Sequence, residues 1–486
     1  MKLLRDASLQ SESSQTLDPQ NWDDIRAQGH RMLDDMLDYI SNIRERPVWQ
    51  PIPDDVRGRF RAGLPAKPSD LDAVYREFAD FIVPYATGNV HPGFMGWVHG
   101  GGTPVGMLAE MLAAGLNANL GGRDHIPIEV EGQIVEWTRQ MFGFPRGASG
   151  IFVTGTSMAN LMAVLVARTA VLGQDGRQHG IGNEGALLTA YTSTAAHGCV
   201  KQAMDLAGFG SDALRRIGTD QSHRIDVAAL RAQIELDRSI GLKPFLVVGS
   251  AGTVDIGAID DLTDLSALCR EQGLWFHIDG AFGALGILSP VLAPQLAGIE
   301  NADSIAFDFH KWGQVPYDAG FLLLRDGDRH RQTFSTPAAY LRRETRGLAA
   351  GSPWPCDLGP DLSRGFRALK TWFTLKAYGT EKLGAAITRT CALAGYLEAR
   401  ISAEPQLELL APVQLNIVCF RYRADDSNRV NGEIVIDIQE SGIAAPSTTM
   451  LDGRLAIRAA IVNHRTDTCD LDALVAAVIR FGAART

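Results

Sequence analysis

A histidine–lysine pair, His310-Lys311, stands where an apolar run of the sequence ends. The run Ser304–Phe307 is predicted to be a strand, and a second apolar run, Gly320–Leu324, resumes after a turn that contains glycine and proline. Lysine is seldom buried without a partner. Desolvation lowers the pKa of an amine by up to about 3–5 units, and the neutral amine condenses with a carbonyl. Lys311 is therefore a candidate Schiff-base lysine, although such pairs also end strands without any chemical role.

A run of small residues, Thr154-Gly155-Thr156-Ser157, follows the predicted strand Ile151–Val153 and precedes an apolar helix predicted over Leu161–Leu172. Backbone N–H groups and hydroxyls at a helix N-terminus bind anions such as phosphate. An ordinary helix N-cap explains Thr156 or Ser157 equally well. The run is a candidate phosphate site, with that alternative open.

Short apolar strands alternate with helical segments through the middle of the chain, which predicts a parallel α/β sheet. Besides the strands already named, strands are predicted over Gly185–Thr189, Phe245–Gly249 and Trp275–Ile278, with a helix over Leu262–Gln272. In such sheets, ligands bind at the carboxyl ends of the strands. The polar candidates predicted to lie there are Thr156, Ser157, His197, Thr253, Asp279 and Lys311.

The segments on either side of this region differ in character. Helices are predicted over Trp22–Arg46 and Leu71–Tyr85, joined by a proline-rich connector, and this part has little core of its own. Further helices are predicted over Val105–Asn117, Ile128–Phe142 and Arg364–Tyr378, and strands over Leu415–Tyr422 and Arg454–Ala460. The stretch Asp326–Pro360 has few periodic apolar positions and is predicted to be an irregular lid.

Composition narrows the class of protein. A chain of 486 residues predicts two or three lobes. The net charge of -10, without a dense Lys/Arg run, argues against a partner that is nucleic acid or an anionic membrane. Six scattered cysteines argue against a disulfide scaffold or a zinc site, and no segment reads as a signal peptide or membrane span. We expect a soluble cytoplasmic protein without a metal.

In chain order, the small-residue turn, His197, Asp279 and the motif His310-Lys311-Trp312 resemble the fold-type I pyridoxal-phosphate enzymes. Within them they resemble the group II amino-acid decarboxylases, which include aromatic-L-amino-acid and glutamate decarboxylases. The resemblance implies an α/β fold with a mainly parallel seven-stranded sheet. It implies an N-terminal helical segment (1–103) packing on a partner subunit, a large cofactor-binding α/β domain (104–368) and a small C-terminal α+β domain (369–486). A homodimer with shared active sites follows from it.

The resemblance also implies roles for single residues. Lys311 would form the Schiff base with pyridoxal 5'-phosphate, Asp279 would pair with the pyridine nitrogen, and His197 would stack on the ring. Gly155, Thr156 and Ser157 would hold the phosphate with help from His310, Ala281 would lie under the ring, and Thr253 would contact the cofactor or its aspartate. Arg458 would receive the substrate carboxylate, for which a planar guanidinium is suited.

The implied reaction is loss of carbon dioxide from an L-amino acid to give the amine. Relatives of this kind use a tyrosine in the lid as the proton donor, but Ala350–Leu358 contains none. Tyr340 or a histidine is a substitute. Without a donor, decarboxylation coupled to oxidative deamination would give an aldehyde. An aminotransferase or an aldol-type lyase uses the same cofactor cradle and stays open.

The predicted substrate pocket contains Trp97 and His99, with Gly100 facing the cofactor. Asn117 and Asn119 are predicted to come from the partner subunit, where aromatic-specific relatives are apolar. An aromatic substrate would stack on Trp97, whereas an acidic or hydroxylated one would use His99, Asn117 and Asn119. The balance favours an aromatic amino acid.

Overall fold

The computed structural model describes residues 16–336 and 342–485, which form two compact units. The first comprises the chain up to Arg46 together with Pro53–Pro84. It contains α1 (Trp22–Ser41), α2 (Asp54–Arg59) and α3 (Leu71–Phe81), with short 3-10 turns after α1 and α3. Asn21 and Asp70 cap α1 and α3 by accepting backbone N–H bonds. Neither α1 nor α3 has a buried residue, as expected of a segment without its own core.

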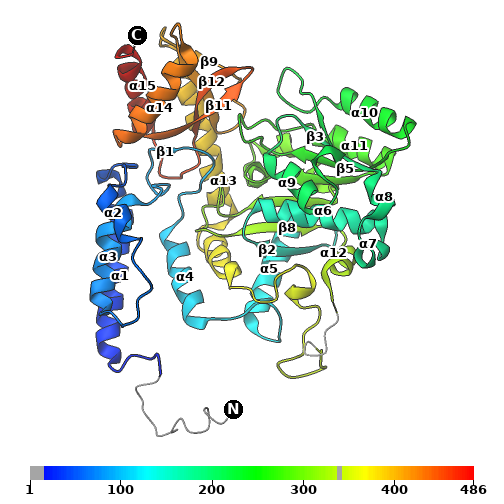
Figure 1. The fold of residues 1–486 in the computed structure, drawn as a ribbon, viewed down its shortest axis with the longest axis horizontal. Coiled ribbons are helices and arrows are strands. Elements are labelled where there is room, and N and C mark those ends of the chain that lie inside the picture. The colour runs from blue at the N-terminus through cyan, green and yellow to red at the C-terminus, as the bar shows by residue number, and fades with distance from the viewer. Residues whose placement is uncertain (1–15, 337–341, 486) are drawn as a thin grey trace. The chain divides into compact units, whose positions relative to one another are not determined.

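The second unit comprises Pro47–Ile52 and the chain from Tyr85 onward, and a seven-stranded sheet forms its centre (Figure 1). The strand order is β2-β8-β7-β6-β5-β3-β4. The bounds are β2 Ser149–Val153, β3 Leu188–Ser193, β4 Leu214–Ile217, β5 Lys243–Ser250, β6 Trp275–Asp279, β7 Ser304–Asp308 and β8 Gly320–Leu324. β8 runs antiparallel to both of its neighbours, β2 and β7, and the other neighbouring strands pair in parallel, so the predicted mainly parallel sheet is confirmed.

Helices flank this sheet, as the alternating sequence pattern predicts (Figure 1). Their bounds are α4 Pro104–Leu116, α5 Ile126–Met141, α6 Thr156–Leu172, α7 Asp175–Gln178, α8 Gly182–Ala186, α9 Gly198–Leu206, α10 Val227–Ser239, α11 Leu262–Gln272 and α12 Gly327–Phe334. Some of the predicted elements differ from the structure. The strand expected at Gly185–Thr189 begins only at Leu188, because residues 182–186 form α8. The stretch Asp326–Pro360 is not wholly irregular, since Asp326 caps α12.

A second sheet belongs to the C-terminal part of this unit and has the order β1-β11-β12-β10-β9. Its strands are β1 Phe94–Met95, β9 Leu407–Leu409, β10 Ile417–Tyr422, β11 Ala445–Leu451 and β12 Arg454–Ala460. The helices α13 (Arg367–Ser402), α14 (Ser427–Glu440) and α15 (Thr468–Ala483) accompany it, and α13 is kinked at Gly379. The predicted smaller α+β part is confirmed, whereas the exact domain boundaries stay a prediction.

An aromatic cluster anchors the strand that leads to Lys311. Phe307 and Phe309 contact each other edge to face, with ring centroids 4.9 Å apart, and both pack against Phe321 of β8. Phe152 of β2 joins them at 5.0 Å from Phe321. All four rings are buried. The residues between and after these phenylalanines are therefore held on a rigid base.

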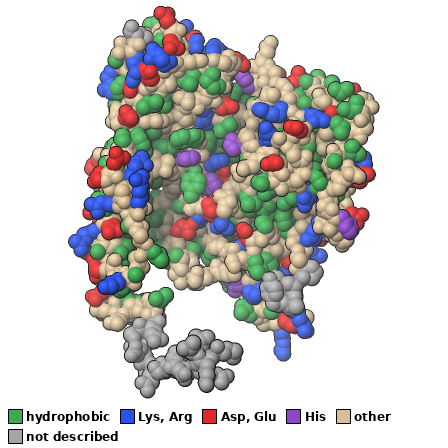
Figure 2. Space-filling model, in the orientation of Figure 1, with side chains coloured by type: hydrophobic (Ala, Val, Ile, Leu, Met, Phe, Trp, Pro, Cys, Tyr) green, Lys and Arg blue, Asp and Glu red, His purple; other side chains and the backbone are tan. Residues whose placement is uncertain are grey.

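The surface and the cysteines fit the composition. Acidic and basic side chains are interspersed over the face shown in Figure 2. All six cysteines are described and are free thiols. In the described part of the chain, none of the helices has the length and apolar character needed to cross a bilayer. The cytoplasmic location stays a prediction from the sequence.

One buried ion pair joins several elements of the large sheet. Arg364, which precedes α13, forms two hydrogen bonds of 2.6 and 3.2 Å with the carboxylate of Glu131 on α5. The same guanidinium donates to the carbonyls of Leu120 and Phe152, each at 3.0 Å. Both charged side chains are at most 5% exposed. Removal of one partner would leave the other charge buried without compensation.

We therefore expect Glu131→Gln to lower the free energy of unfolding by about 3 kcal/mol, measured as a shift of the urea midpoint. The control is Glu136→Gln on the same helix, which removes an exposed pair with Arg139 and should leave the midpoint unchanged. Equal midpoints for the two variants would contradict the account of Arg364.

Candidate active site

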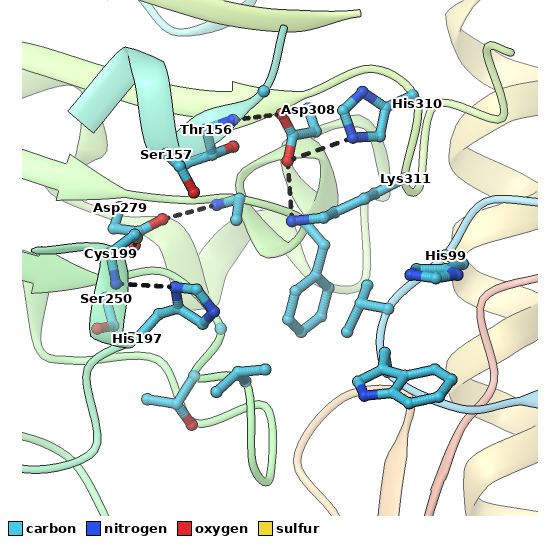
Figure 3. A pocket seen from close by; sticks show the side chains of 18 of the residues that line it. His99, Thr156, Ser157, His197, Cys199, Ser250, Asp279, Asp308, His310 and Lys311 are labelled. Carbon is cyan, nitrogen blue, oxygen red and sulfur yellow. Dashed lines mark hydrogen bonds and ion pairs between the residues drawn. The ribbon is translucent and has the colours of Figure 1, made fainter. Parts of the chain in front are cut away.

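A cavity of about 370 Å³ lies at the carboxyl ends of β2, β5, β6 and β7 (Figure 3). This is the edge of the sheet at which a ligand was expected. The sequence candidates that line it are Trp97, His99, Gly155, Thr156, Ser157, His197, Thr253, Asp279, Ala281, His310 and Lys311. Asn117, Asn119 and Arg458 are not among the lining residues.

Lys311 meets a carboxylate that the sequence analysis did not identify. Its Nζ lies 2.8 Å from Oδ2 of Asp308, the last residue of β7, and Asp308 is 2% exposed (Figure 3). The other oxygen, Oδ1, accepts the backbone N–H of Thr156 at 2.8 Å. Asp308 thus connects the lysine to the first turn of α6. An acidic residue three positions before the lysine, at a strand end, was the available signal.

Backbone packing fixes the segment on the far side of Lys311. A Cβ atom added to Gly100 would lie 2.2 Å from the carbonyl oxygen of His310 and 2.6 Å from that of Lys311. Such contacts are far below van der Waals distance, so only glycine allows this approach. The glycine-containing stretch Trp97–Gly102 therefore lies directly against the lysine segment.

The small-residue turn forms the N-terminus of α6. The helix begins at Thr156, earlier than the predicted Leu161, with Gly155 as its N-cap residue. Thr156 is buried, and its Oγ1 has no hydrogen-bond partner among the residues that the structure describes. A buried hydroxyl without a partner is costly unless a ligand satisfies it. Together with the positive end of the helix dipole, this position fits a phosphate group.

Asp279 ends β6, and its carboxylate faces the cavity. Burial raises the pKa of Asp279, and the nearby charges of Lys311 and His197 oppose that effect. Its oxygens accept hydrogen bonds from the Asn160 amide at 3.1 Å and from the Ala281 N–H at 3.2 Å. These donors, together with a cationic ring nitrogen in the cavity, would hold the carboxylate in its charged form. The position fits the pyridine nitrogen of pyridoxal phosphate.

Two histidines on the cavity wall have fixed orientations. His197 is the N-cap residue of α9, and its Nδ1 accepts the backbone N–H of Cys199 at 3.2 Å (Figure 3). His310 accepts the Ala319 N–H through Nδ1 at 3.0 Å, and its Nε2 lies 3.6 Å from Oδ2 of Asp308. Burial lowers the pKa of His310 to about 4, so its ring is neutral near pH 7.

Thr253 is buried in the cavity wall, and its Oγ1 accepts the Ala258 N–H at 3.0 Å. This hydroxyl therefore stabilises the turn between residues 253 and 258. The ring of His99 contacts Trp97, Phe94 and Tyr317, with centroid distances of 5.5 to 6.0 Å. Trp97, His99 and Tyr317 also line the cavity, so part of its wall is aromatic.

Three candidates lie outside this cavity. The guanidinium of Arg458 is buried and donates to the backbone carbonyls of Val254, Asp255 and Trp97. It therefore binds the backbone of Val254 and Trp97, which line the cavity. Asn117 has a left-handed backbone and caps α4, and Asn119 accepts the backbone N–H groups of Gly121 and Arg364. Tyr340, the suggested proton donor, lies outside the described residues.

Comparison with known proteins agrees with this arrangement. The family model of the pyridoxal-dependent decarboxylase conserved domain matches residues 53–423. An aromatic-L-amino-acid decarboxylase of Bacillus atrophaeus is 35% identical over 457 residues, which cover 92% of this chain and 93% of that protein. A phenylacetaldehyde synthase of Arabidopsis thaliana is 28% identical, and the match covers 93% of this chain and 94% of that protein. A crystal structure of Oryza sativa TDC with PLP and tryptamine has a TM-score of 0.88 at 24% identity, and the match covers 97% of this chain and 100% of that chain.

The fold and the cavity define a pyridoxal-phosphate enzyme of fold type I. Because the family model covers most of the chain and a relative of 35% identity spans nearly all of it, the chain belongs to the pyridoxal-dependent decarboxylase family. It is a carboxy-lyase that uses pyridoxal 5'-phosphate, as the resemblance in the sequence implied.

The cavity also determines the reactivity of a cysteine. Burial and the charge of Asp279 raise the pKa of Cys199 to about 12. Alkylation requires the thiolate, and at pH 8 only about one thiol in ten thousand would be ionised at this position. We expect iodoacetamide at pH 8 to modify the exposed Cys469 and to spare Cys199, measured by peptide mass spectrometry of the native protein. Equal rates at the two cysteines would contradict this electrostatic account.

Proposed function

We propose that this enzyme decarboxylates an aromatic L-amino acid to the amine and carbon dioxide. The observation that carries the proposal is that Lys311 and Asp279 line one cavity together with the rings of Trp97 and His99. An aromatic side chain would stack against these rings. The names of similar proteins support the same substrate class, since the relatives include decarboxylases of tyrosine and tryptophan.

The proposed roles follow from the positions of the side chains. Lys311 would join the cofactor aldehyde through Nζ, and Asp279 would hold the pyridine nitrogen. Thr156 and Ser157 would bind the phosphate at the start of α6, with Gly155 giving close backbone approach and His310 supporting this side of the cavity. His197 would stack on the ring, and Ala281 and Thr253 would complete the wall.

Pyridoxal phosphate, when bound, accepts the electron pair released when the bond between the α-carbon and the carboxylate breaks. The chain's own task is to orient the substrate and to exclude water. The aromatic wall at Trp97 and His99 would place the substrate side chain, and Asp279 and Asp308, which also line the cavity, are largely buried from bulk solvent.

A proton must then reach the substrate α-carbon, and the described lid provides no tyrosine for it. His197 and Tyr317 both line the cavity, and each carries a proton that could be transferred. Burial raises the pKa of Tyr317, so its hydroxyl keeps its proton near pH 7. We propose these two as the candidate donors.

A second candidate function is decarboxylation coupled to oxidative deamination, which gives an aldehyde, hydrogen peroxide and ammonia. The lack of a tyrosine in the described part of the lid favours it, and a phenylacetaldehyde synthase is among the relatives. The two reactions differ in whether the α-carbon receives a proton or reacts with oxygen.

Purified protein loaded with pyridoxal phosphate should release carbon dioxide from L-tyrosine, L-tryptophan or L-phenylalanine in an L-amino-acid panel, with formation of the amine. Carbon dioxide, hydrogen peroxide and ammonia are followed together. Lys311→Ala should lose at least about 10³-fold in rate, as expected for removal of a covalent catalytic group. Peroxide and ammonia in amounts equal to carbon dioxide would favour the aldehyde reaction. A keto acid without carbon dioxide would refute both.

We also propose a homodimer in which Asn117 and Asn119 of one subunit reach the active site of the other. Next to these residues, α4 exposes Met111, Leu112 and Leu116, each at least 46% accessible. The apolar faces of α1 and α3 have no buried residue, which suits an N-terminal segment that packs on a partner. A surface of the partner subunit would cover the exposed side chains of α4 and the apolar faces of α1 and α3.

Sedimentation equilibrium should therefore give about twice the chain mass of 52.5 kDa. Leu116→Glu should shift the protein to monomer and reduce activity, because it places a charge in the proposed interface. Leu236→Glu, at an exposed leucine of α10, is the control. A monomeric wild-type protein with full activity would contradict the proposal.

A further inference from the structure

A line of polar side chains runs through the core beneath Asp279. The alternation of side chains along β6 places Trp275, His277 and Asp279 on the same face of the sheet. His277 lies opposite Ser304 on the neighbouring strand β7. Helix α6 contributes Asn160 to the same face. His277, Ser304 and Asn160 are each at most 1% exposed, so each must find its hydrogen-bond partners within the protein.

The distances connect these side chains without a gap. The indole Nε1 of Trp275 lies 2.9 Å from Oγ of Ser304, which lies 2.8 Å from Nδ1 of His277. On the other side of the ring, Nε2 of His277 lies 2.8 Å from Oδ1 of Asn160. The amide Nδ2 of Asn160 lies 3.1 Å from Oδ2 of Asp279.

The two ends of this line determine the direction of every hydrogen bond. An ionised carboxylate can only accept, so the amide NH₂ of Asn160 is turned toward Asp279 and its Oδ1 toward Nε2 of His277. The single proton of the neutral ring must then be on Nε2, from which it is donated to Oδ1 of Asn160. Nδ1 of His277 is then left to accept the hydroxyl proton of Ser304, whose oxygen in turn accepts the indole N–H of Trp275, a group that can only donate.

Two further observations agree with this direction. Burial lowers the pKa of His277 to about 3, so the ring carries one proton near pH 7. The remaining N–H of Asn160 points to Sγ of Cys199 at 3.1 Å, and this sulfur lies 3.8 Å from Oδ2 of Asp279. Every polar atom of the Asn160 side chain is therefore engaged.

We propose that Trp275, Ser304, His277 and Asn160 form a one-way hydrogen-bond chain that holds the Asp279 carboxylate in its ionised form and directs it into the cavity. The four are positioning residues, since none of them lines the cavity. The consequence for cofactor affinity rests on the proposed function of Asp279. The tautomer of His277 does not depend on that function.

The direct test is solid-state NMR of the protein without cofactor, labelled with ¹³C,¹⁵N-histidine at pH 7. The protonated nitrogen of His277 should correlate with Cδ2, which identifies it as Nε2. The resonances are assigned from their loss in His277→Phe or, should that variant not fold, from their displacement in Trp275→Phe. A protonated nitrogen that correlates with Cγ, or a doubly protonated ring, would overturn the proposal.

Cofactor affinity gives the second readout, measured by equilibrium dialysis with pyridoxal phosphate. Asn160→Leu should weaken binding roughly ten- to a hundredfold, as expected when a charged group loses a buried hydrogen bond. Trp275→Phe, at a less buried position, should weaken binding several-fold and carries the test if Asn160→Leu does not fold. The matched control is His330→Phe, which removes another fully buried histidine with a pKa lowered to about 3 and bonded to Ser149. It should bind within about twofold of wild type.

The outcomes distinguish the proposed hydrogen-bond chain from the proposed function of Asp279. Unchanged pyridoxal phosphate affinity in Asn160→Leu and Trp275→Phe, with weakened affinity in Asp279→Asn, would overturn the proposed hydrogen-bond chain. The expected His277 tautomer together with unchanged affinity in Asp279→Asn would support the chain and contradict the proposed function of Asp279.

Discussion

The site depends on one buried carboxylate, that of Asp308. One oxygen pairs with Nζ of Lys311 and the other accepts the N–H of Thr156, so a single side chain joins the Lys311 amine to the start of α6. A charge at 2% exposure is costly in the absence of partners. Because both oxygens are engaged, the end of β7 and the first turn of α6 must keep their relative positions.

The sheet supplies the rest of the arrangement. Parallel strands present their carboxyl ends at one edge, so Asp279 at the end of β6 and Asp308 at the end of β7 come to the same cavity. The aromatic cluster of Phe307, Phe309 and Phe321 prevents the lysine segment from shifting along the sheet. Gly100 adds a backbone contact that no other residue would tolerate. The reactive groups are therefore placed by rigid elements, which is what catalysis by orientation requires.

Much of the fold could be predicted from local patterns. The predicted bounds of α11 and β8 agree with the structure, because apolar periodicity and flanking turn residues mark both clearly. The start of α6 was placed too late, since Thr156, Ser157 and Met158 read as a loop until the N-cap at Gly155 is seen. The helix α12 was missed because it is short and polar. The first turn of a helix and short polar helices are difficult to identify from local sequence.

The site was predicted less completely than the fold. Residues that follow strands were identified because the edge of a parallel sheet is implied by the pattern. Asp308 was missed because its importance comes from joining Lys311, three positions further on, to Thr156, which is 152 positions away in the chain. The hydrogen bonds of Arg458 to three carbonyls were likewise invisible, since burial of an arginine depends on tertiary packing.

The most direct measurement of the central claim is reduction of the cofactor-loaded protein with borohydride, followed by proteolysis and peptide mass spectrometry. Reduction makes the bond between a lysine and an aldehyde cofactor permanent. The account predicts that the peptide containing Lys311, and no other lysine peptide, gains the mass of reduced pyridoxal phosphate. Cofactor mass on a different lysine, or an unmodified Lys311 in active protein, would contradict it.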